Sequence, residues 1–277
     1  MAVNLYRPAA DPPRPLTCFI YGAPRRAKTS LAASFPRPIV ISAGVEGGDR
    51  TLQLFPDTEA IRVRNRSEVE EAVRFVQLNR TAHGWQTVVI DSITFILESV
   101  IAEFSGVKAD KTYGKMDQQA WGRLESWLTK WLMPTLHALP MHIVWIALEK
   151  QIMDRESGVI VRTEPMIPGG SSQKLPACCD LILYADTMAV VPQGGGQPYQ
   201  AYCMRTSETP GRAICGGRFG PVFPEGYLWP NFRAIAERIG PQIGVSLAAP
   251  QPQPQPQPQL QPQPQPPQSA VAAGGAV

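Results

Sequence analysis

Lys28 and Thr29 stand at the end of a short turn, and residues of these types at this spacing bind phosphate and magnesium. An apolar segment, residues 16–21, precedes the turn, and an apolar helix-like segment, residues 30–35, follows it. The turn itself consists of Gly22, Ala23, Pro24, Arg25, Arg26 and Ala27. It matches the phosphate-binding pattern G-x-x-x-x-G-K-[ST], except that Ala27 occupies the place of the second glycine. The sequence therefore predicts a strand, a phosphate-binding loop and a helix in this order.

The chemistry expected of this loop is nucleotide binding with ATP and Mg²⁺ as cofactors. Backbone N–H groups from Gly22 to Ser30 would surround phosphate oxygens at the positive end of the following helix. Lys28 would bridge the β- and γ-phosphates, and the Thr29 hydroxyl would ligate Mg²⁺. If the backbone at Ala27 has a positive φ, its methyl group adds a steric cost that glycine avoids. This substitution predicts weaker nucleotide binding, and it leaves hydrolysis open.

A second apolar segment, residues 85–91, ends in Asp91 and is followed by Ser92. Many buried strands end in an aspartate, so the segment alone is a weak signal. After a phosphate-binding loop, however, such an aspartate holds Mg²⁺ through its water shell. Thr29 and Asp91 are thus the predicted metal-binding pair.

Two further acidic residues follow predicted strands. Residues 38–42 form an apolar segment, and the glycine-rich loop after it contains Glu46. Glu46 is either a solvated loop residue or the base that activates water, since loops at the carboxyl ends of strands form α/β ligand sites. Residues 141–148 are almost wholly apolar, as expected of a strand buried on both faces, and deliver Glu149 to the same edge.

Two polar segments have residues that could contact nucleic acid. The first, residues 105–116, contains Lys108, Lys111, Tyr113 and Lys115. The second, residues 163–177, is glycine-rich and is predicted to be a loop, with Arg162 beside it and Lys174 within it. Lysine and arginine would bind phosphates and the tyrosine ring would stack on a base. The alternative for the first segment is an ordinary solvated loop.

The alternation of predicted strands and helices indicates a three-layer α/β domain over residues 16–240, with a mainly parallel sheet. A short antiparallel hairpin is expected near its C-terminal end, around Gly194 to Gly196. Residues 1–15 are predicted to form an extended arm. Residues 241–277 contain a Pro-Gln alternation that cannot bury a core, which predicts a disordered tail.

Composition excludes several classes of protein. The chain has 277 residues, 44% of them hydrophobic, and a net charge of +3, which permits nucleic-acid binding without arguing for it. Its five cysteines contain no C-x-x-C pair, which argues against a zinc site or a disulfide framework. With no apolar run near the ~20 residues of a membrane span, and no apolar leader, a cytoplasmic protein without membrane contact is expected.

The motifs GAPRRAKT, VEGG, VVIDS, ALEK and GGRFG together resemble the RecA-fold P-loop ATPases of bacteriophages, the RecA-core single-strand annealing and recombination ATPases. The resemblance covers residues 16–224 and implies that the strand at 141–148 lies between the loop-bearing strand and the Asp91 strand. It implies that Glu46 polarises the attacking water and that Glu149 senses the γ-phosphate. Arg218, or less surely Arg205 or Arg212, would reach a neighbouring subunit's nucleotide. Segments 105–116 and 163–177 would be DNA-binding loops.

The resemblance leads to a first hypothesis, a DNA-dependent ATPase that acts on single-stranded DNA in phage-type recombination, annealing or replication. Such a protein would form a homo-oligomer, as a ring or a filament, would work in the host cytoplasm, and could have a single-strand-binding protein as a partner. A second hypothesis is a phosphotransferase that uses the same loop on a small acceptor. A third is a nucleotide-binding scaffold that does not hydrolyse ATP because Ala27 has weakened the site.

Overall fold

A computed structural model describes residues 12–44, 49–105, 118–192, 196–208 and 213–247. Contacts within the chain divide it into two units, Met1–Ser246 and Leu247–Val277, and the architecture below is that of the first. Among the described residues, no helix combines the length and apolar content needed to cross a membrane.

The strands of the described residues follow one another as β1 (Thr17–Gly22), β2 (Pro38–Ser42), β3 (Glu59–Arg62), β4 (Thr87–Asp91), β5 (His142–Met153), β6 (Ile160–Pro165), β7 (Leu181–Val190), β8 (Tyr199–Arg205), β9 (Gly216–Gly217) and β10 (Tyr227–Leu228). The helices are α1 (Lys28–Ala33), α2 (Asp49–Leu52), α3 (Arg66–His83), α4 (Ile93–Phe104), α5 (Gln118–Trp127), α6 (Met133–His137), α7 (Ser171–Ala177) and α8 (Phe232–Ile239). A π-helical turn, η2 (Leu128–Leu132), joins α5 to α6, and a 3₁₀ turn, η3 (Gly240–Ile243), follows α8.

The central sheet has the strand order β10-β8-β7-β1-β5-β4-β2-β3. Its strands from β7 to β3 are parallel, and β8 and β10 are antiparallel additions. The loop-bearing strand β1 and the Asp91 strand β4 each pair with β5, which confirms the predicted position of the strand at 141–148. Strands β2 and β4 are buried at every position, because helices cover both faces of the sheet.

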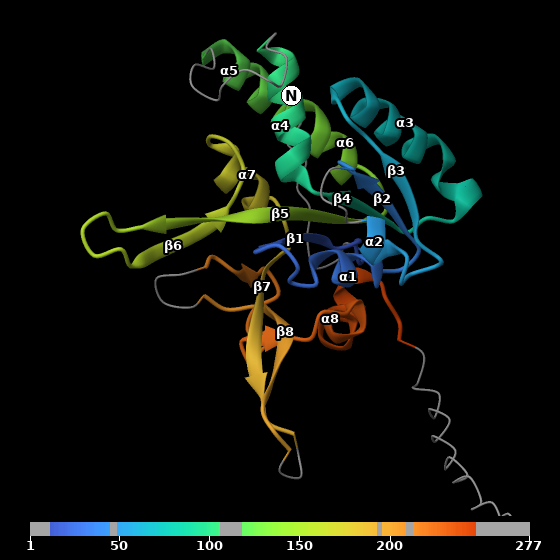
Figure 1. The fold of residues 1–277 in the computed structure, drawn as a ribbon. Coiled ribbons are helices and arrows are strands. Elements are labelled where there is room, and N and C mark those ends of the chain that lie inside the picture. The colour runs from blue at the N-terminus through green and yellow to red at the C-terminus, as the bar shows by residue number, and fades with distance from the viewer. Residues whose placement is uncertain (1–11, 45–48, 106–117, 193–195, 209–212, 248–277) are drawn as a thin grey trace, which may run out of the picture. The chain divides into compact units, whose positions relative to one another are not determined.

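Helices lie on both faces of the sheet (Figure 1). On one face, apolar side chains of α3, α4, α5, η2 and α6 pack against residues such as Tyr21 and Trp145. On the other face, α1 and α8 pack against residues such as Ile20 and Leu183. This arrangement confirms the predicted RecA-like α/β class: three layers, a mainly parallel sheet and a C-terminal antiparallel hairpin.

Two β-ribbons extend from the edge of the sheet at which β1 ends (Figure 1). At its last residue, β1 pairs with Leu148 of β5 on one side and with Ala185 of β7 on the other. Both neighbours continue, β5 to Met153 in a hairpin with β6, and β7 to Val190 in a hairpin with β8. The phosphate-binding loop therefore follows β1 at an edge where two longer strands flank it.

The prediction that residues 163–177 form a loop is wrong for most of this segment. The end of β6 occupies its first residues, and helix α7 begins at Ser171 after a short turn. The β6 backbone pairs with β5, and Glu149 lies opposite Pro165. Glycine, serine and proline in this segment indicated a loop, but the pairing with β5 decides the conformation of its first part.

Candidate nucleotide-binding site

The loop after β1 has the backbone geometry that its sequence pattern predicts. Gly22 has a φ of +150°, and a Cβ atom there would lie 2.6 Å from the carbonyl oxygen of Ala185. Only glycine fits this conformation and this approach of β7. The loop then reaches Ala27, whose φ of 57° and ψ of 20° are left-handed, and α1 begins at the next residue. The positive φ considered for Ala27 is therefore present.

Lys28 is buried and its ammonium group lies over the loop. The Nζ atom donates to the carbonyl oxygen of Gly22 at 2.9 Å and to that of Ala23 at 2.6 Å. The side chain thus turns back from the first residue of α1 to the start of the loop, with only 7% of its surface exposed. The ammonium therefore lies at the loop that leads into α1, and the N-terminus of a helix favours anions such as phosphate.

Thr29 of α1 and Asp91 of β4 meet although β5 lies between β4 and β1, the strand that leads into α1. The Thr29 hydroxyl donates to Oδ2 of Asp91 at 2.8 Å. Asp91 ends β4, is 6% exposed, and pairs in register with Ile146 of β5. A hydroxyl and a carboxylate side by side are oxygen ligands of the kind that Mg²⁺ prefers. The residues present therefore fit a magnesium nucleotide, with Lys28 on the phosphates and Thr29 and Asp91 at the metal.

Glu149 lies one residue beyond the level of Gly22, inside β5 rather than at a strand end. Its Oε2 accepts a hydrogen bond from the Tyr184 hydroxyl at 2.9 Å, and its Oε1 accepts one from the Gln151 amide at 2.9 Å. Burial, and next the hydrogen bond to Glu149, raise the pKa of Tyr184. The phenol therefore stays protonated and remains a donor over the whole neutral range.

Arg218 lies away from the loop in its own subunit. Its guanidinium donates to the Ala177 carbonyl oxygen at 2.6 Å and lies 3.7 Å from the Asp180 carboxylate. The Asp180 backbone N–H donates to Thr17, the first residue of β1. Arg218 is thus at the amino end of β1, whereas the loop is at its carboxyl end. A role of Arg218 in a neighbouring subunit stays a prediction. Arg205 forms an ion pair with Asp186 of β7. Asp186 directly follows Ala185, the residue that pairs with Gly22.

The two described residues predicted to bind DNA already have acidic partners. Arg162 on β6 forms an ion pair with Glu164, and Lys174 on α7 forms one with Glu125 of α5. Their contact with nucleic acid stays a prediction. Glu46, Lys108, Lys111, Tyr113, Lys115 and Arg212 lie outside the described residues.

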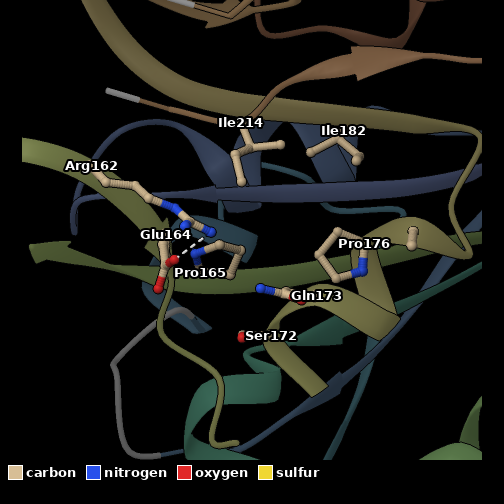
Figure 2. Close-up of a pocket in the computed structure, with 9 residues that line it drawn as sticks. Arg162, Glu164, Pro165, Ser172, Gln173, Pro176, Ile182 and Ile214 are labelled. Atoms are coloured by element: carbon tan, nitrogen blue, oxygen red, sulfur yellow. Dashed lines mark ion pairs between the residues drawn. The ribbon is translucent and has the colours of Figure 1, made fainter. Parts of the chain in front are cut away.

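Arg162 and Glu164 also line a cavity of about 290 Å³ between β6, α7 and β7. Figure 2 shows this ion pair on one side of the cavity and Ile182 and Ile214 on another. The described residues around the cavity include none from the phosphate-binding loop. The cavity is therefore a feature separate from the nucleotide-binding site.

Sequence reasoning missed Tyr184, the partner of Glu149. The signal was a tyrosine in an otherwise apolar stretch, the sequence LILYA at the start of β7. A buried tyrosine hydroxyl needs a hydrogen-bond partner, so its position next to a predicted site edge could have been noticed. Its partner could not be named, because Glu149 lies 35 residues away and the pairing depends on the strand order.

Comparisons with known proteins gave a family match and similar solved structures. A solved structure of a KaiC-like protein from the hyperthermophilic archaeon Pyrococcus horikoshii matches with 11% identity, covering 79% of this chain and 91% of that chain, at a TM-score of 0.39. A search of curated proteins gave no match. A family model described as an AAA domain matches residues 14–213, which include the loop, Asp91, Glu149 and Tyr184. The chain therefore belongs to this family of AAA domains.

Proposed function

We propose that the chain binds ATP with Mg²⁺ and hydrolyses it. The observation that carries this proposal is the contact between the Thr29 hydroxyl and the Asp91 carboxylate beside the buried Lys28. Two residues at the start of α1 and one at the end of β4 converge at the carboxyl edge of the sheet, where α/β proteins bind their ligands. Membership of the AAA domain family supports the same conclusion.

Each residue has a defined part in this proposal. Lys28 holds phosphate oxygens in place of the two loop carbonyls that its ammonium now contacts. Thr29 and Asp91 hold the metal, which when bound neutralises the developing charge on the phosphates. Glu149 senses the γ-phosphate, an assignment that comes from the resemblance. Glu46 polarises the attacking water, an assignment that rests on the resemblance alone.

The first experiment measures ATP binding and hydrolysis by the full chain with and without Mg²⁺. Lys28→Ala removes the buried ammonium and is expected to lower hydrolysis about 100-fold or more, because charge-assisted phosphate contacts are lost. Lys130→Ala removes an exposed lysine of η2 and serves as the matched control. Hydrolysis by Lys28→Ala at the wild-type rate would overturn the assignment of the site.

A finer proposal is that single-stranded DNA stimulates this ATPase in phage-type recombination, annealing or replication. It is supported by the lysines of segment 105–116 and by the resemblance to RecA-core proteins. ATPase rates measured with and without single-stranded DNA, at two salt concentrations, separate three functions. Salt-sensitive stimulation supports the DNA-dependent ATPase. Unstimulated hydrolysis favours a phosphotransferase, and nucleotide binding without hydrolysis favours a scaffold.

The proposal also includes a homo-oligomer, in the form of a ring or a filament, in which Arg218 of one subunit serves the nucleotide of the next. A mixing experiment tests this point. Lys28→Ala retains Arg218, and an Arg218→Ala protein retains the loop. If Arg218 acts between subunits, mixing the two inactive proteins restores part of the activity. Two proteins that stay inactive when mixed, although they form oligomers, would exclude this role. A single-strand-binding protein remains a possible partner of such an assembly.

A further inference from the structure

Tyr184 and Glu149 form a direct bridge between the two ribbons beside the phosphate-binding loop. Strand β1 ends at Gly22, between Leu148 of β5 and Ala185 of β7. Glu149 is the next residue along β5, and Tyr184 is the residue just before Ala185 in β7. Their side chains meet with the Tyr184 hydroxyl 2.9 Å from Oε2 of Glu149. The hydrogen bond therefore joins strands that β1 separates along its whole length.

The tyrosine ring is held by packing. Its centroid lies 5.3 Å from that of Tyr21, which is fully buried on β1. The Tyr21 hydroxyl in turn donates to the carbonyl oxygen of Ile214 at 2.9 Å. A ring fixed in this way presents its hydroxyl in one place, so the carboxylate of Glu149 is drawn to one position.

The charges around this bond come from the nucleotide-binding loop and from β7 itself. Arg26 of the loop and Asp186 of β7 lie close enough to act on Tyr184, the arginine lowering its pKa and the aspartate raising it. The carboxylate of Glu149 is also bonded to Gln151 through its other oxygen. Both oxygens are thus oriented, at the place where the loop leaves β1.

We propose that Tyr184 is a positioning residue, which holds the Glu149 carboxylate in the orientation needed at the γ-phosphate side of the loop. This inference rests on the proposed ATPase function and adds a residue to it. A donor on a fixed ring achieves this at low entropic cost, since the carboxylate of a free glutamate samples several rotamers. The bridge is half-buried, so solvent competes only in part for the carboxylate.

The test uses Tyr184→Phe, which keeps the ring and removes only the hydroxyl. We expect kcat to fall about 10-fold while the affinity for ATP is unchanged, because orientation is lost and phosphate contacts are kept. Glu149→Ala, which removes the acceptor, and the double variant complete the cycle, and the double variant should be no slower than Glu149→Ala alone. Tyr202→Phe makes the same chemical change at an exposed tyrosine of β8 and is the control.

A second double-mutant cycle measures how much the hydrogen bond contributes to stability in the absence of nucleotide. Tyr184→Phe should raise the unfolding equilibrium constant about 10-fold, and in the Glu149→Ala background, which lacks the acceptor, by no more than about twofold. If the unfolding cycle shows this coupling but kcat does not change, the bond is only structural and the proposal is wrong. If neither cycle shows coupling, the proposal is also wrong. A wild-type chain that does not hydrolyse ATP would instead refute the proposed function, and the role of Tyr184 with it.

Discussion

Replacing Gly22 by alanine should weaken the fold at the junction between β1 and the loop. The added Cβ would lie 2.6 Å from the Ala185 carbonyl oxygen and 3.0 Å from the Ala185 Cβ, closer than folded proteins allow. The atoms in the way belong to the β7 backbone, which pairs with β1 on one side and β8 on the other. A rotamer change therefore cannot relieve the contact.

The expected cost has two parts. Placing a Cβ on a backbone with a φ of +150° costs on the order of 1–3 kcal/mol. Moving β7 away from β1 adds about 1–3 kcal/mol, the usual range for overpacking a close-packed interior. The sum, about 2–6 kcal/mol, corresponds to a fall in Tm of about 4–24 °C for a domain of this size.

Urea unfolding followed by circular dichroism measures this change, provided that the m-value stays the same. Gly122→Ala is the matched control, since Gly122 lies in α5 with open space around its Cβ position. The same chemical change there should raise the unfolding free energy by about 0.5–1 kcal/mol, because alanine favours the helix. A Gly22→Ala protein within 1 kcal/mol of wild type would refute the steric argument.

Two other predictions concern a buried histidine and the unusual alanine of the loop. Burial lowers the pKa of His142 to about 4, while its Nδ1 accepts the backbone N–H of Leu16 at 2.9 Å. Between pH 6.5 and about 4 the unfolded chain binds the extra proton, so stability should fall by about 3 kcal/mol as the pH drops through this window. In His142→Asn, which keeps an acceptor, this slope should disappear in urea titrations; an unchanged slope would contradict the assignment. Ala27→Gly should raise the unfolding free energy by about 1 kcal/mol and tighten ATP binding, because left-handed strain at Ala27 is relieved; a less stable protein would show that the methyl packing outweighs the strain.

Much of the fold could be predicted because the buried strands are apolar on both faces. The predicted strand at residues 38–42 has the limits of β2. The meeting of Thr29 with Asp91 could be predicted because a phosphate-binding loop earlier in the chain turns a strand-ending aspartate from a weak signal into a strong one. Helix α1 begins at Lys28, two residues before the predicted start, because the loop is shorter than its polar composition indicated.

The ends of β5 and β7 could not be predicted, for a physical reason. Beyond Leu148 and Ala185 both strands leave the core, and the burial that makes a strand apolar ends there. The exposed residues of the ribbons do not alternate clearly between apolar and polar side chains, so no pattern indicated that the predicted strand should be extended. Glu149 was therefore expected at a strand end. The neighbourhood of Arg218 likewise depends on the pairing of β9 with β7, two residues of glycine that carry no pattern.

Strand β5 links the interior to a distant tip in one unbroken piece. Its 12 residues extend about 40 Å at roughly 3.3 Å per residue, and its first half pairs with β1 on one side and β4 on the other. The outer half is joined to β6 in register until the irregularity between Ile152 and Met153. A displacement of the hairpin near its turn would therefore also displace Glu149, because both belong to the same paired strand. A molecule that binds the turn of this hairpin would change the position of residues beside the phosphate-binding loop without contacting them.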